Sequence, residues 1–223
     1  MKFEAKELLI AIAAKNKGDW DKTFKALQYK ETPTDEEIEN FFPIVDQSIT
    51  IIDEDYPKTW KHVDKSPLVL FYKGGRKSLI NKVDISSVFV LDDNKNPQTK
   101  KIICDLLDHD KLVVIPILDA GNIMIKYGKQ ALVLSEYPYV GVTYDVNSTE
   151  KRRRVAQIGA GLCGKLFVGI SKDTEVVRAA VISALSNGRD IYVAPTRLGT
   201  AYENNKFIRD GASIALDWLD IAC

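Results

Sequence analysis

The sequence has few of the residues that mark secreted or metal-binding proteins. It contains three cysteines and two histidines in 223 residues. Cys104, Cys163 and Cys223 have neither the spacing of a disulfide framework nor that of metal ligands, so we expect a reducing, cytoplasmic compartment. His62 and His109 lie outside any Cys/His cluster and are expected at the surface. We therefore predict no metal site and no other cofactor.

An excess of one charge and long apolar runs are also absent. Lysine plus arginine equals aspartate plus glutamate, at 31 each, which excludes a protein that coats nucleic acid through its overall charge. Any anionic ligand must therefore meet a local basic patch. No apolar run approaches the roughly 20 residues of a membrane-spanning helix, and the first stretch has the pattern of an amphipathic helix rather than a signal peptide. We expect no membrane partner.

Residues 1–55 have a helical pattern and are predicted to form a small N-terminal helical domain. Apolar residues recur three and four positions apart in two stretches, at Leu8, Leu9, Ile12 and Ala13 and at Trp20, Phe24 and Leu27. Thr34 is followed three residues later by Glu37, which predicts a capping box at the start of a further helix.

Residues 56–223 alternate between apolar runs and helical patterns. Helices are expected at 97–110, 148–163 and 174–187, and strands at 67–75, 85–93, 111–118, 131–138, 165–171 and 190–196. Strands that are apolar on both faces and separated by helices are typical of a parallel sheet covered on both sides. The pattern predicts an α/β fold with a Rossmann-like, doubly wound, mostly parallel sheet. It leaves the strand order open.

Four consecutive cations, Lys151 to Arg154, occupy the predicted start of the helix at 148–163. In doubly wound sheets, ligands bind beyond the carboxyl ends of the strands, and the helix after a strand begins at that edge. Backbone N–H groups at a helix start attract anions, and the planar fork of arginine suits phosphate. A charge run of this kind is otherwise a solvated helix terminus.

Several strings resemble the DNA-processing protein A (DprA/Smf) family, in the same order and over most of the chain. They are "DYPKTWKHVDKSPLVLFYKGG" (55–75), "LSEYP" (134–138), "KRRRVAQIGAGL" (151–162), "NGRDIYVAP" (187–195) and "NNKFIRDGA" (204–212). The resemblance implies a Rossmann-like fold that binds single-stranded DNA without catalysis. It also implies a homodimer that helps to load a RecA-type recombinase.

The chain departs from this family at two places. The first Rossmann strand of the family ends in a Gly-Ser-Arg turn that binds phosphate, whereas this chain has "VFVLDDN", which places Asp92 and Asp93 there. The family's next unit is shortened to "KLVVIPILDAGNIMIKYG" (111–128). The chain thus resembles a shortened, diverged relative, of the kind that a phage or mobile element carries.

The leading hypothesis is a non-enzymatic protein that binds single-stranded DNA along a basic rim at the carboxyl edge of the sheet. Its phosphate contacts are predicted at Lys151, Arg152, Arg153, Arg154 and Arg197. Tyr137, Tyr139 and Tyr144 are candidates for stacking on bases, because every base has a π-face. They are equally suited to packing over the sheet edge.

A second hypothesis is a binder of a small nucleotide-derived ligand, such as a signal nucleotide. Its pocket would comprise Ser135, Glu136, Tyr137, Thr196, Gly199, Thr200, Glu203 and Asn205. The string "APTRLGTAYEN" (194–204) loosely resembles the phosphate-binding loop of the lysine decarboxylase-like "lonely guy" proteins, but Thr196 and Arg197 replace two of its glycines. A third hypothesis is a nucleotide N-glycosidic hydrolase that uses Glu203. Such a glutamate more often caps a helix or pairs with an arginine.

Overall fold

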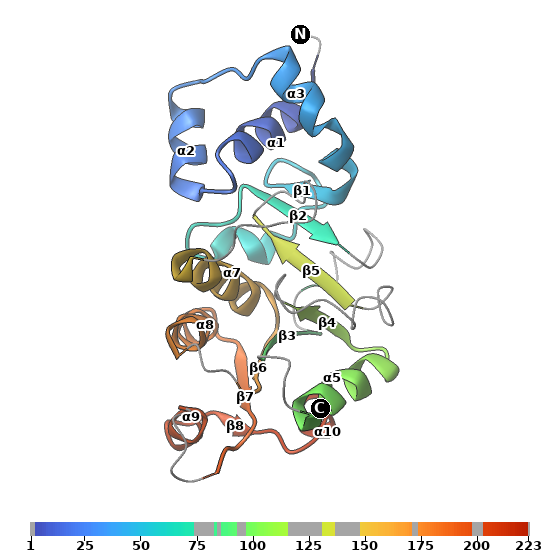
Figure 1. Ribbon diagram of the computed structural model, residues 1–223, viewed down its shortest axis with the longest axis vertical. Coiled ribbons are helices and arrows are strands. Elements are labelled where there is room, and N and C mark those ends of the chain that lie inside the picture. The colour runs from blue at the N-terminus through green and yellow to red at the C-terminus, as the bar shows by residue number, and fades with distance from the viewer. Residues whose placement is uncertain are drawn as a thin grey trace. The chain divides into compact units, whose positions relative to one another are not determined.

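The computed structural model describes residues 3–73, 83, 86–92, 97–115, 131–136, 148–170, 174–197 and 203–222 (Figure 1). The chain divides into two compact units. The first unit comprises Met1–Lys73 with Leu134–Asp145, and the second comprises Gly74–Val133 with Val146–Cys223. The domain boundary near residue 55 stays a prediction.

The first unit begins with the predicted helices and adds a small sheet. Its helices are α1 (Ala5–Lys15), α2 (Trp20–Gln28), α3 (Asp35–Phe41) and two 3₁₀ helices, η1 (Phe42–Gln47) and η2 (Lys58–His62). Strand β1 (Ser48–Thr50), which was not predicted, pairs antiparallel with β2 (Val69–Lys73). The apolar stripe of α1 packs on β2 in a core of Leu9, Ile10, Ala13, Val69 and Phe71.

Side-chain caps fix where two helices of this unit begin. At α3, Thr34 Oγ1 accepts from the backbone N–H of Glu37 at 3.2 Å, and Glu37 Oε2 accepts from the backbone N–H of Thr34 at 2.9 Å. The predicted capping box is therefore confirmed. At α2, Asp19 Oδ1 accepts from the backbone N–H of Lys22 at 3.0 Å. Both caps satisfy backbone donors that a helix start leaves open.

The second unit is built on a parallel sheet with strand order β5-β4-β3-β6-β7-β8. The strands are β3 (Ser87–Leu91), β4 (Leu112–Ile115), β5 (Ala131–Ser135), β6 (Lys165–Val168), β7 (Asp190–Val193) and β8 (Ser213–Ile214). Each neighbouring pair is parallel. The chain winds outward from β3 to β5 and then restarts at β6, beside β3, so the winding direction reverses between β3 and β6.

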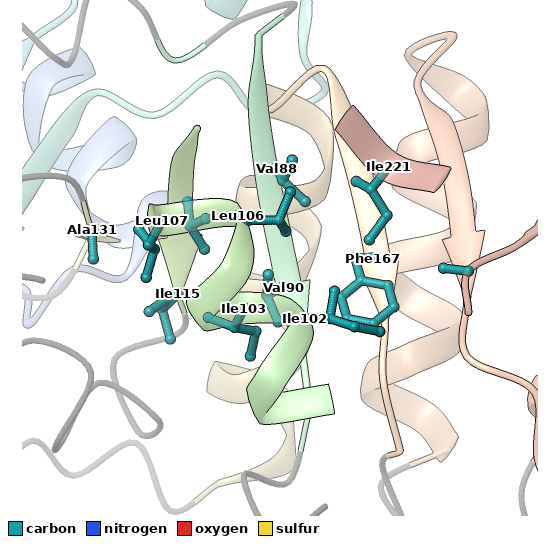
Figure 2. Packing of buried hydrophobic residues seen from close by; sticks show 12 residues of the cluster. Val88, Val90, Ile102, Ile103, Leu106, Leu107, Ile115, Ala131, Phe167 and Ile221 are labelled. Atoms are coloured by element: carbon teal, nitrogen blue, oxygen red, sulfur yellow. The ribbon is translucent and has the colours of Figure 1, made fainter. Parts of the chain in front are cut away.

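Helices cover both faces of this sheet. Side chains of α5 (Pro97–Asp108) and α10 (Leu219–Ala222) pack on one face, where Val88 and Val90 of β3 meet Leu106 and Ile221 (Figure 2). Phe89, the residue between those valines, points to the opposite face, which carries α7 (Thr149–Leu162). α8 (Thr174–Ser186) packs beside α7 (Figure 1). The predicted doubly wound α/β fold is confirmed.

A glycine allows α7 to approach the sheet closely. A Cβ added at Gly159 would lie 2.2 Å from Cε2 of the Phe89 ring, a distance at which the helix or the ring would have to move. Because α7 follows the carboxyl end of β5 and leads to the amino end of β6, it runs antiparallel to the strands. Its first turns therefore lie at the carboxyl edge of the sheet.

Candidate nucleic-acid interface

A buried carboxylate lies at the point where the winding reverses, between β3 and β6. Asp92 follows β3 and is 4% exposed, and its Oδ1 accepts a hydrogen bond from the backbone N–H of Ile170 at 3.0 Å. A Cβ at Gly169 would lie 2.9 Å from Cβ of Asp92. Asp92 thus joins two strand ends at the place where such sheets bind ligands. Asp93 lies outside the described residues.

The next two strand ends are joined by an amide. Asn204, the first residue of α9 (Asn204–Arg209), is 2% exposed. Its Nδ2 donates to the carbonyl oxygens of Gly169 at 2.7 Å and of Ala194 at 2.8 Å. These carbonyls follow β6 and β7, so one side chain holds both strand ends to the helix.

A reciprocal pair of hydrogen bonds holds Thr196, which follows β7, to Asn205 of α9. The backbone N–H of Thr196 donates to Asn205 Oδ1 at 3.0 Å, and Asn205 Nδ2 donates to the Thr196 carbonyl at 2.7 Å. Among the described residues, the buried Oγ1 of Thr196 has no hydrogen-bond partner. The following residue, Arg197, is exposed. The cation Arg197 therefore directly follows a residue that two hydrogen bonds hold to α9, at the carboxyl edge.

Glu203 is paired with an arginine of α8. The guanidinium of Arg178 donates from Nε to Glu203 Oε2 at 2.7 Å and from Nη2 to Glu203 Oε1. These hydrogen bonds with Arg178 lower the pKa of Glu203 and raise the pKa of Arg178. A carboxylate with both oxygens engaged and a lowered pKa is poorly suited to general acid–base catalysis.

The basic block lies in the first two turns of α7, as predicted. Ser148 caps the helix by accepting from the backbone N–H of Lys151 at 3.3 Å. The four cations differ in exposure: Arg153 is exposed, whereas Lys151, Arg152 and Arg154 are half-buried. Nε of Arg152 is fully buried. Arg153 is therefore the cation of this block that the fold presents most openly to solvent.

The other predicted pocket residues fall into three groups. Ser135 and Glu136 are buried and belong to the first unit, where Glu136 lines a cavity of about 10 Å³ with Trp20 and Thr23. Tyr137, Tyr139, Tyr144, Gly199 and Thr200 lie outside the described residues. Thr196, Glu203 and Asn205 lie in the described structure, where the backbone of Thr196 and the side chains of Glu203 and Asn205 already make hydrogen bonds.

Sequence reasoning missed three residues that shape this edge. Asn204 bonds partners that lie 35 and 10 positions away, so no local pattern marks it. Arg178 is a single cation within an apolar helix. The role of Ser148 could have been predicted from the sequence, because a serine directly before a helical pattern is a common N-cap.

Two further properties concern the described part of the chain. No helix in it is long and apolar enough to cross a membrane. Within the same residues, no group of three His, Cys, Asp or Glu side chains is placed to hold a metal ion.

Solved structures share this architecture, although comparison with protein-family models and with curated protein sequences gives no match. The DNA processing protein A of Streptococcus pneumoniae is 18% identical with a TM-score of 0.65, and the match covers 99% of this chain and 93% of that one. The protein of the same name from Helicobacter pylori, whose structure concerns a single-stranded DNA binding mode, is 13% identical with a TM-score of 0.59, over 79% of this chain and 94% of that one. The chain therefore has the fold of the DprA proteins.

Proposed function

We propose that this protein binds single-stranded DNA, without catalysis, along the carboxyl edge of the sheet in its second unit. The supporting observation is that cations on two separate elements, α7 and the loop after β7, lie at this edge of a DprA-type sheet. The H. pylori protein with this fold binds single-stranded DNA. The phosphate contacts that we propose are Lys151, Arg152, Arg153, Arg154 and Arg197.

The five cations differ in exposure, so we expect them to contribute differently to phosphate binding. Arg153 and Arg197 are exposed and can donate two hydrogen bonds each to a phosphate. Arg152 is half-buried and its Nε is buried, so less of its guanidinium is open to a phosphate. Each phosphate neutralised by a cation releases counterions, so binding should weaken as salt is raised.

The two alternative functions gain no support. In phosphate-binding loops, backbone N–H groups approach the phosphate, but the N–H of Thr196 already donates to Asn205. The N-glycosidic hydrolase hypothesis relied on Glu203, whose carboxylate is held by Arg178. The resemblance to the DprA/Smf family leads us to propose a RecA-type recombinase and a second copy of the chain as protein partners, in the cytoplasm.

Charge reversal of the two exposed cations tests the proposed edge. The variant Arg153→Glu with Arg197→Glu should bind a fluorescent oligothymidylate far more weakly. The slope of log affinity against log salt should fall by about 0.7 for each phosphate of the single strand that the variant no longer neutralises. Fluorescence anisotropy measures both. Arg152 is left unchanged because its buried Nε would make a failure to fold a rival explanation.

The control is Arg209→Glu, which changes an exposed cation at the far end of α9. It should bind like the unmodified protein. Unchanged affinity in the Arg153/Arg197 variant, with an intact circular dichroism spectrum, would contradict the proposal.

A further inference from the structure

Helix α2 of the first unit carries a stacked aromatic pair that the proposed edge does not use. The rings of Trp20 and Phe24 lie 4.9 Å apart between centroids, with 12° between their planes. Their spacing of four residues places them on one face of the helix. Phe24 is 39% exposed, so part of its ring meets solvent.

The pair is held firmly from the protein side. Trp20 Nε1 donates to the carbonyl oxygen of Ser66 at 2.8 Å, and Lys65 Nζ lies 5.5 Å from the centroid of the Trp20 ring. Thr23 is buried between the two aromatic positions and its hydroxyl donates to the Asp19 carbonyl at 2.7 Å. Phe24 thus stacks on a ring that is itself held in place, which reduces the conformational freedom that Phe24 would lose when a flat ligand stacks on it.

Two lysines beside the stack are paired with carboxylates. Lys65 pairs with Asp21 at 2.7 Å, and Lys22 pairs with Asp19 at 3.3 Å. Lys25, which follows Phe24, is exposed. The exposed part of the Phe24 ring therefore offers a flat apolar surface of the kind that contacts a base. Stacking on an aromatic side chain tolerates any base sequence.

We propose that the Trp20–Phe24 stack is a base-stacking site for single-stranded nucleic acid in the first unit. The inference rests on the proposed function, since it assigns a base contact in the first unit to the class of ligand that we propose for the second. It differs from that function in its chemistry, because stacking requires bases and is little affected by salt. The two contacts can therefore be tested separately.

The test compares Phe24→Leu with the unmodified protein, using an oligothymidylate and an abasic oligonucleotide of the same length. Leucine keeps apolar bulk but removes the π-face. Affinity for oligothymidylate should fall roughly five- to hundredfold, the range for removal of one stacked base, with the salt slope unchanged. Affinity for the abasic strand should not change. The matched control is Tyr29→Leu, which removes a 79% exposed aromatic side chain at the end of the same helix.

Two outcomes would overturn the inference alone. Phe24→Leu could bind oligothymidylate as the unmodified protein does, or its affinity for both oligonucleotides could fall equally. In either case, weakened binding in the Arg153/Arg197 variant would leave the proposed function standing. An unmodified protein with no affinity for either oligonucleotide would overturn both.

A fluorescence measurement keeps the inference falsifiable if Phe24→Leu does not fold. In a Trp218→Phe background, Trp20 and the fully buried Trp60 are the remaining tryptophans. Oligothymidylate should quench the emission of this protein and the abasic strand should not. Equal emission with both strands at saturation would overturn the inference.

Discussion

At the scale of single residues, buried polar side chains hold the carboxyl edge of the second unit in one arrangement. Asp92 joins β3 to β6, and Asn204 joins β6, β7 and α9. Each buried hydrogen bond contributes about 0.5–1.5 kcal/mol, and a partner left unsatisfied costs more. The end of β7, which precedes Arg197, is thereby held to β6 and α9.

The pair formed by Glu203 and Arg178 should make stability depend on pH in a defined direction. The pKa of Glu203 is lowered in the folded protein from its ordinary value of 4.5, so its contribution is fully present above that value and is lost as the pH falls through the folded pKa. Glu203→Gln should therefore lower the thermal midpoint at pH 7, and the difference from the unmodified protein should shrink on acidification. Thermal unfolding followed by circular dichroism measures this. A difference that is constant down to acid pH would contradict the assignment.

The sequence could indicate the basic block but not the separate roles of its members. Neighbouring residues on a helix are turned by about 100° from one another, so Arg152 and Arg153 face different surroundings although they look equivalent in the sequence. The same limit applies to Glu203. Its pairing with an arginine was one of the interpretations that the sequence left open, and its partner, Arg178, lies 25 positions away.

At the scale of helices and strands, the length of an element determines whether the sequence predicts it. The predicted helices at 97–110, 148–163 and 174–187 are α5, α7 and α8, and each has 12 or more residues. The predicted strands also contain β2 to β7. The described elements that were missed are short: β8 has two residues, β1 three, α10 four, η2 five and α9 six. Elements of this length have too few residues to show a period, and tertiary contacts stabilise them.

The close approach of α7 to β3 gives a test at this scale. At an open site, Gly→Ala in a helix stabilises a protein by about 0.4–1 kcal/mol. Gly159→Ala should instead destabilise by about 1–3 kcal/mol, because the new methyl group meets the Phe89 ring. Urea unfolding gives the free energies. In a double-mutant cycle with Phe89→Leu, the two destabilisations should be less than additive. A stabilised Gly159→Ala variant would contradict the packing described here.

At the scale of the whole molecule, the fold persists where local motifs have changed. Identity with the S. pneumoniae protein is 18%, yet the structural match covers 99% of this chain. The apolar strands and the Gly159–Phe89 contact maintain the layers. A sheet of this kind depends on its apolar pattern, so its fold could be predicted while its ligand could not.

The central claim is that the basic edge binds single-stranded DNA. Its most direct test is to measure, by fluorescence anisotropy, the affinity of the unmodified protein for oligothymidylate at roughly 50 mM and 200 mM salt. We expect binding that weakens steeply with salt, with a log–log slope of about 0.7 for each phosphate contacted on a single strand. Nucleoside monophosphates should not compete. Absence of binding at the lower salt concentration, or binding that salt leaves unchanged, would contradict a single-stranded DNA-binding role for the basic edge.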